Sequence, residues 1–164
     1  MPNGLEIEKK YLIVYPDTEL LKRLGATEKR MEQTYLASEE SVSERVRMSE
    51  TNGVAVYTHT RKKKVKGIVR QEEERTISKA EYDALLERKE PGASTIKKTR
   101  YVLPLGGLVW EFDVFPFWQD KAFLEVELER EDQEVVLPDF VTVVADVSEN
   151  PSYTNHALAR RFGF

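Results

Sequence analysis

The sequence contains no cysteine and only two histidines, His59 and His156, among its 164 residues. The lack of cysteine excludes a disulfide scaffold, a thiolate zinc site and a cysteine nucleophile. A metal site built from several imidazoles is excluded as well, so any metal must be held by carboxylates. Carboxylate oxygens suit a hard cation such as Mg²⁺ or Mn²⁺.

Long apolar runs are also missing. No stretch reaches the roughly 18 consecutive apolar residues of a membrane helix, and no apolar signal segment stands at the N-terminus. We therefore expect a cytoplasmic protein without a membrane partner. The charges nearly balance, with 25 basic and 29 acidic residues and a formal net charge of -4. No positive field over the whole chain favours nucleic acid, so we expect no nucleic-acid partner.

The length and composition indicate one folded domain that spans residues 1–164. Hydrophobic residues make up 40% of the chain, which separates it from disordered proteins. No repeat, low-complexity linker or change of composition divides it. Charged residues make up 33%, a high share, so the arrangement of the charges is the most informative feature.

Most of the chain has the two-residue periodicity of β-strands. The predicted strands are residues 4–14, 29–37, 41–50, 53–62, 68–77, 95–104, 108–115 and 122–130, with 140–148 as a candidate ninth. The predicted helices are residues 18–24, 78–89 and 152–162. The dipeptides Asn52-Gly53 and Gly106-Gly107 predict tight hairpins. This pattern predicts an α+β, mainly β fold: an antiparallel β-barrel with helices packed outside.

Each predicted strand carries its charges on one face. Strands 41–50 and 95–104 contribute bases to that face, whereas strands 108–115 and 122–130 contribute acids. Charges that only make a surface soluble normally mix both signs along a strand. The separation by sign therefore favours a functional role for these faces over simple exposure to solvent.

Aromatic residues on the opposite faces need a cover. The residues in question are Tyr101, Trp110, Phe112 and Phe123. If the helices cover them from outside, the charged faces point into the barrel, whose interior must then be wide enough for water and a ligand. Bases facing carboxylates suit a polyphosphate bound with Mg²⁺ or Mn²⁺, because Arg binds phosphate oxygens bidentately and carboxylates hold the metal. No glycine-rich phosphate loop is present, so side chains must bind the phosphates.

An ordered set of motifs spans the chain. In order, they are Glu6-Ile7-Glu8-Lys9-Lys10, Gln33-Thr34-Tyr35-Leu36, Arg45-Val46-Arg47, Thr60-Arg61-Lys62, Arg70 to Glu74, Lys98 to Tyr101, Trp110 to Phe115, Glu125 to Leu128 and Tyr153-Thr154-Asn155. The first is an ExExK motif, and the set resembles the CYTH domain of the triphosphate tunnel metalloenzyme superfamily. The resemblance implies an eight-stranded antiparallel β tunnel with a charged lumen, a small triphosphate substrate and a divalent metal.

The resemblance also implies roles for individual residues. The metal-binding acids would be Glu6, Glu8, Glu125 and Glu127, with Glu72, Glu74, Glu111 and Asp113 beside them on the tunnel wall. The triphosphate-binding bases would be Lys10, Arg45, Arg47, Lys62, Lys98 and Arg100, joined by Arg70. Within residues 62–66, Lys62 is preferred because it shares the strand face of Thr58 and Thr60.

A mechanism follows as a hypothesis. One metal is expected on Glu6, Glu8 and Glu127, and a second on other acids of the tunnel. Lys10 is expected to contact a phosphate, and Tyr35 to line the tunnel mouth, although a packing role for Tyr35 stays open. His59 and His156 are expected outside the tunnel, without a role.

The expected substrate depends on a motif of the cyclase members that this sequence lacks. Members of the family include inorganic triphosphatases, thiamine triphosphatases and class IV adenylate cyclases. Cyclase members tend to carry a His-Phe pair shortly before ExExK, and none precedes Glu6. We therefore favour hydrolysis of inorganic tripolyphosphate or another short triphosphate. A non-catalytic polyphosphate-binding module is the alternative of another class, and the oligomeric state, including a homodimer, stays open.

Overall fold

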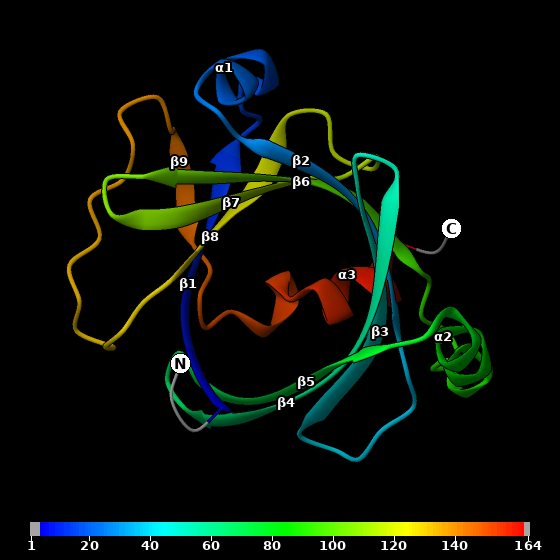
Figure 1. Cartoon of the computed structure of the whole chain (residues 1–164). Coiled ribbons are helices and arrows are strands. Elements are labelled where there is room, and N and C mark those ends of the chain that lie inside the picture. Colours follow the sequence, from blue (N-terminus) through cyan, green and yellow to red (C-terminus); the bar gives the residue numbers. More distant parts are fainter. Residues whose placement is uncertain (1–3, 163–164) are drawn as a thin grey trace.

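The computed structural model describes residues 4–162, in which nine strands form one antiparallel sheet. The strands are β1 (Leu5–Val14), β2 (Thr27–Tyr35), β3 (Val42–Thr51), β4 (Val54–Lys66), β5 (Val69–Ile77), β6 (Ile96–Leu105), β7 (Leu108–Val114), β8 (Lys121–Glu127) and β9 (Val143–Asp146). Their order is β5-β4-β3-β2-β6-β7-β8-β1-β9, and pairing of β5 with β1 closes eight of them into a barrel. Figure 1 shows this ring with β9 beside β1. The predicted antiparallel barrel is confirmed.

The helices within the described residues are short. They are α1 (Thr18–Arg23), α2 (Lys79–Leu85) with the 3-10 turn η2 (Leu86–Arg88), the 3-10 turn η3 (Pro151–Tyr153) and α3 (Asn155–Arg161). Ser78 and Glu81 form the capping box that starts α2, because each side chain bonds the backbone N–H of the other residue. None of these helices is long and apolar enough to cross a membrane.

Two hairpins form where turn residues adopt the left-handed conformation. Asn52 and Gly53 have φ values of 51° and 81°, and Gly106 and Gly107 have values of 65° and 81°. Positive φ at both central residues matches the twist of a tight two-residue hairpin. These turns fix the register of β3 with β4 and of β6 with β7, and therefore decide which side chains face the interior.

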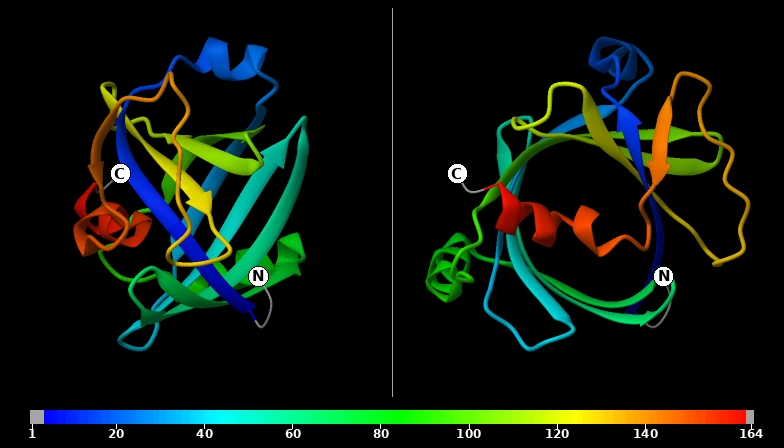
Figure 2. Two further views of the ribbon diagram at one scale, coloured as in Figure 1. Left: turned by 90° about the vertical axis from the view of Figure 1, so that its left-hand side faces the viewer. Right: turned by 180° about the vertical axis from the view of Figure 1, so that it is seen from behind.

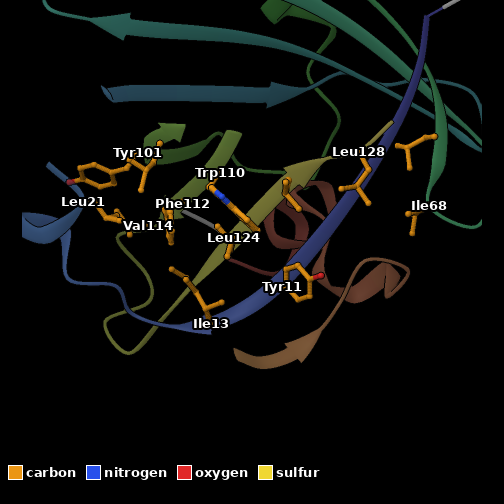
Figure 3. Packing of buried hydrophobic residues seen from close by; sticks show 14 of the residues in the cluster. Tyr11, Ile13, Leu21, Ile68, Tyr101, Trp110, Phe112, Val114, Leu124 and Leu128 are labelled. Atoms are coloured by element: carbon orange, nitrogen blue, oxygen red, sulfur yellow. The ribbon is translucent and has the colours of Figure 1, made fainter. Parts of the chain in front are cut away.

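The largest hydrophobic cluster lies on the outer face of the barrel. Trp110, Phe112 and Leu124 are buried there together with Leu21 of α1 (Figure 3). Val135, Leu137 and Val141, from the segment that follows β8, pack against the same cluster. One helix and one irregular segment therefore cover the aromatic face of β6, β7 and β8, which leaves the opposite faces of these strands to point inward.

A second cluster covers β3 and β4. Val46 and Ile77 are buried against Tyr82 of α2, and Figure 1 shows α2 outside the ring. The expected packing of helices on the outer wall therefore holds for α1 and α2.

The C-terminal helix takes a different position. Helix α3 lies across one end of the barrel (Figure 2, right), where Leu158 and Ala159 are buried with Leu12 and Phe123. Phe123, expected on the outer face, is therefore inside this end. The reason is parity: Phe123 lies two residues before Glu125 on β8, so both side chains face the interior. The helix and its aromatic neighbours close this end, which we call the closed end.

Candidate anion and metal site

The barrel encloses a cavity of about 820 Å³. Every one of the eight barrel strands contributes to its wall, together with residues between Val147 and His156. The predicted site residues that line it are Glu6, Glu8, Lys10, Tyr35, Arg45, Arg47, Lys62, Arg70, Glu72, Glu74, Arg100, Glu111, Glu125 and Glu127. Charges that would face solvent on a flat sheet therefore meet in one interior space.

Strand register brings acids from three strands together. Glu125 of β8 pairs with Lys10 of β1 on one side and with Glu111 of β7 on the other. Carboxylate oxygens of Glu8, Glu111 and Glu125 lie within 4.8 Å of one another. Glu6 and Glu127 line the same cavity without joining this group, so the three acids that meet differ from the expected set of Glu6, Glu8 and Glu127.

Burial makes ionisation of this acid group costly, although Arg100 contacts Glu111 and Glu125, and Lys10 contacts Glu125. Burial and the neighbouring Glu125 raise the pKa of Glu8 to about 8, and burial also raises the pKa of Glu111. Burial opposes ionisation of Glu125 too, but Lys10 and Arg100 outweigh it and lower the pKa of Glu125 to about 2. Three converging carboxylates with this need for positive charge fit a hard divalent cation.

The basic wall contains two arginines without a carboxylate partner. Among residues 4–162, neither Arg45 nor Arg47 forms an ion pair: Arg47 Nε donates to the Gln33 amide oxygen, and the buried Nε of Arg45 has no hydrogen-bond acceptor. Burial, together with Arg45 and Arg100, lowers the pKa of Arg47 to about 9. Arg47 therefore keeps its charge at neutral pH, and the two guanidinium groups create a demand for an anion in the cavity.

Lys98 and Asp113 share the inward faces of β6 and β7 but do not reach the cavity. Asp113 accepts hydrogen bonds from Lys98 Nζ at 2.8 Å and from Arg100 Nε at 2.7 Å. Burial would raise the pKa of Asp113, but Arg100 and Lys98 outweigh it and hold that pKa well below its usual range. The structure therefore makes Asp113 a counter-ion for two bases, whereas the sequence placed it beside the metal ligands.

The remaining bases approach the acids. Lys10 Nζ lies 3.5 Å from Glu125 Oε1, and Lys62 Nζ lies 3.1 Å from Glu6 Oε1. Lys64, two residues after Lys62, lines the cavity as well. The basic segment at the end of β4 thus sends two lysines inward.

Arg70 of β5 uses its guanidinium partly to hold the adjoining turn. Its Nη1 donates to the carbonyl oxygen of Gly67 at 3.1 Å. The side chain still lines the cavity, where it stands across from Lys64 in the register of β4 and β5.

Tyr35 and His156 meet at the closed end. Their rings stack with centroids 4.3 Å apart and an interplanar angle of 5°. His156 Nε2 lies 3.0 Å from Glu90 Oε1, and its Nδ1 lies 3.3 Å from Ser43 Oγ. Tyr35 was expected at the tunnel mouth and His156 outside, yet both line the cavity. The position of α3 across the barrel end explains both differences, and no periodicity within β2 signals it.

His59 follows the expectation. Its Nε2 lies 2.6 Å from Glu44 Oε2, and Glu44 also accepts a hydrogen bond from Arg88. The imidazole points away from the cavity, as its position opposite Thr58 and Thr60 on β4 predicts.

These features define a barrel whose interior combines arginine side chains that lack a carboxylate partner with three converging carboxylates suited to a divalent metal ion. The chain belongs to the CYTH domain family, whose model matches residues 4–152. Among solved structures, the inorganic triphosphatase NE1496 is 30% identical and matches 94% of each chain, with a TM-score of 0.57.

More distant structures share the fold. The PH1819 protein from Pyrococcus horikoshii OT3 is 23% identical over 77% of this chain and 80% of that chain, with a TM-score of 0.61. The putative adenylyl cyclase HpAC1 from Hippeastrum, described as having a dominant triphosphatase activity, is 15% identical over 76% of this chain and 80% of that chain, with a TM-score of 0.52. A search among curated proteins gives no match to the chain.

Proposed function

We propose that the protein hydrolyses a phosphoanhydride bond of a short triphosphate with the help of Mg²⁺ or Mn²⁺, and that inorganic tripolyphosphate is its first candidate substrate. The observation that carries this proposal is that one cavity contains both arginines suited to an anion and carboxylates suited to a cation. Within residues 4–162, Arg45 and Arg47 have no carboxylate partner, while Glu8, Glu111 and Glu125 converge with only Arg100 and Lys10 as their basic contacts. A polyphosphate bound with a divalent metal suits both sets of side chains at once.

The acids would hold the metal. Glu8, Glu111 and Glu125 are the residues suited to it, because their oxygens converge from three strands. When bound, such a metal polarises a phosphoryl oxygen and acidifies a water molecule. Glu6 and Glu127, which line the same cavity, stand near enough in sequence and register to support this group.

The bases bind and orient the substrate. Arg45 and Arg47 present donors to the phosphate oxygens, and Arg100, held by Asp113, presents its guanidinium from the adjoining wall. Fixed positive charges around the transferring phosphoryl group stabilise the charge that spreads over its oxygens as the bond breaks. Lys10, which lines the cavity 3.5 Å from Glu125, adds a further ammonium donor.

An organic triphosphate is the second candidate. Val54 and Val56 of β4 line the cavity although they are 65% and 45% exposed. Exposed apolar side chains in a charged cavity offer a surface for an uncharged group attached to a phosphate. This observation keeps nucleoside and thiamine triphosphates, and hence cyclase chemistry, among the alternatives.

The test is a substrate panel. Phosphate release from tripolyphosphate, ATP and thiamine triphosphate is measured with Mg²⁺, with Mn²⁺ and with EDTA. We expect metal-dependent release, fastest with tripolyphosphate, and its loss in Glu8→Gln but not in the exposed control Glu134→Gln. Formation of cyclic AMP from ATP would show that the protein is a cyclase and would contradict the proposed hydrolysis. Tight binding without any release would favour a polyphosphate-binding module.

A further inference from the structure

Gln33 connects two side chains that line the cavity, although it does not line the cavity itself. Its Oε1 accepts a hydrogen bond from Arg47 Nε at 3.1 Å, and its Nε2 donates one to Tyr35 Oη at 3.0 Å. Gln33 itself is 0% exposed. We propose that Gln33 is a positioning residue that aims Arg47 and Tyr35 at the bound triphosphate, an inference that rests on the proposed function.

Strand geometry places the three residues together. Gln33 and Tyr35 are two residues apart on β2, so their side chains share the inward face. Gln33 also stands directly opposite Arg47 in the register of β2 and β3. The orientation of the amide follows from Arg47, because a guanidinium only donates and therefore must face the amide oxygen.

The hydrogen bond to Gln33 uses Nε of Arg47, which is not needed for an end-on contact between the guanidinium and a phosphate. With Nε engaged, both terminal nitrogens of the guanidinium remain for a bidentate contact with phosphate oxygens. An amide oxygen also provides this acceptor without a negative charge. A carboxylate at position 33 would form an ion pair with Arg47 and compete with the substrate for it. A neutral acceptor keeps the cation both fixed and available.

The bond to Tyr35 sets the direction of a proton. Because the Gln33 amide donates to the Tyr35 oxygen, the phenolic proton must point elsewhere. The Tyr35 ring is held by its stack on His156, so its hydroxyl cannot swing far from the wall. The free direction is toward the cavity that Tyr35 lines. One buried amide thus prepares two donors for the same anion.

The test compares Gln33→Leu with Thr34→Val. Thr34 is the adjacent residue, is equally buried, and bonds the hydroxyl of Thr95 at 2.8 Å on the opposite face of β2. Steady-state kinetics with tripolyphosphate gives KM and kcat, and calorimetry in EDTA gives the Kd of tripolyphosphate for the metal-free protein. Far-UV circular dichroism and thermal unfolding establish that both variants fold.

We expect Gln33→Leu to raise KM and Kd by roughly tenfold to a hundredfold, the cost of losing a hydrogen bond to a charged group. The fall in kcat should be smaller, because the acid group is untouched. Thr34→Val should leave KM and Kd within about twofold of the wild type. A merely structural role would instead lower thermal stability in both variants without separating their KM values.

Gln33→Glu provides a second variant of almost unchanged shape. Its carboxylate still accepts from Arg47, but it neutralises the guanidinium and cannot donate to Tyr35, so tripolyphosphate should bind more weakly at neutral pH. This variant carries the test if Gln33→Leu does not fold. Unchanged Kd in the Gln33 variants, or an equal loss in Thr34→Val, overturns the proposal.

The two proposals fail in different ways. If the wild type binds tripolyphosphate but releases no phosphate, the proposed hydrolysis is wrong, and the Kd comparison still decides the role of Gln33. If the wild type hydrolyses tripolyphosphate and Gln33→Leu keeps its KM and Kd, only the positioning role is wrong. If the wild type does not bind tripolyphosphate at all, both are wrong.

Discussion

Lys98 and Asp113 form an ion pair in which both side chains are completely excluded from solvent, with Nζ and Oδ2 2.8 Å apart. The same carboxylate accepts two hydrogen bonds from Arg100. Asp113 therefore balances two buried cations, of which only Arg100 reaches the cavity. A buried pair of this kind contributes less through net attraction than through the cost of removing one partner.

The first prediction concerns Asp113→Asn. The change leaves Lys98 and Arg100 without their shared counter-ion, so we expect the free energy of unfolding to fall by about 3–5 kcal/mol. Urea denaturation measures this loss. The exposed Asp139→Asn serves as a matched control and should change stability by less than about 0.5 kcal/mol. A similarly small effect of Asp113→Asn would show that the two bases find another partner.

The second prediction concerns Arg47→Met, which removes an unpaired cation. Because Arg47 bonds the neutral amide of Gln33 and has no carboxylate partner among the described residues, its loss relieves desolvation and repulsion from Arg45. Because this relief is offset by the loss of the hydrogen bond to the buried Gln33 amide oxygen, we expect the free energy of unfolding to change by less than about 1 kcal/mol. The increase in Tm that tripolyphosphate produces should disappear, since ligand stabilisation follows affinity.

The control for Arg47→Met is Arg61→Met on the exposed side of β4. It should retain the full increase in Tm with tripolyphosphate, measured by differential scanning calorimetry. If Arg47→Met retained the same increase, the anion would have to bind elsewhere in the barrel.

The third prediction is a pH-dependent metal affinity. Burial and Glu125 raise the pKa of Glu8 to about 8 in the metal-free protein, so Glu8 is protonated below that pH and cannot ligate. Affinity for Mn²⁺ should therefore weaken by about tenfold for each pH unit below 8 and level off above it. Calorimetric titrations between pH 6 and 9, in buffers of different ionisation enthalpy, also report the released proton.

The matched variant for this experiment is Glu8→Gln, which removes the titrating group. Its residual Mn²⁺ affinity should be weak and should lack the step near pH 8. An affinity of the wild type that stays flat from pH 6 to pH 9 would contradict the assignment of Glu8 as a metal ligand.

The strands and their faces could be predicted from the sequence because both depend on local patterns. The alternation of Glu6, Glu8 and Lys10 placed these side chains on one face, and β1 begins at Leu5, within a residue of the expected start. The turn at Asn52-Gly53 fixed the pairing that sends Arg45 and Arg47 to the same side. The aromatic residues on the opposite faces, which need helices to cover them from outside, indicated that these charged faces point into the barrel, and the family resemblance implied the same.

The depth of a residue along the barrel could not be predicted in this way. Glu111 and Asp113 share a face of β7, yet Glu111 meets Glu125 while Asp113 pairs with Arg100 in the register of β6 and β7. Which of them reaches the cavity depends on the shear between strands, and parity does not encode it. The position of His156 in the cavity wall was not predicted for a related reason. Helix periodicity indicates which face of α3 carries His156, but not which part of the barrel that face contacts.

The fourth prediction uses the contact that fastens α3 to the barrel. Glu90 accepts hydrogen bonds from both Arg160 and His156. Arg160 is the main cause of the low pKa of Glu90, which falls from 4.5 to about 2 even though burial opposes the shift. A depressed pKa means that the ionised form stabilises the fold. This contribution is complete above pH 4.5 and is lost as the pH falls toward 2.

Glu90→Gln should therefore lower the free energy of unfolding at pH 7 by about 1–2 kcal/mol, a range reduced for the solvent-exposed side chain of Arg160. The difference from the wild type should shrink below pH 4.5 and vanish near pH 2, as measured by urea unfolding at each pH. The exposed Glu87→Gln should show no such pH-dependent difference. A constant difference at every pH would mean that the packing of α3, and not the charge of Glu90, holds the closed end in place.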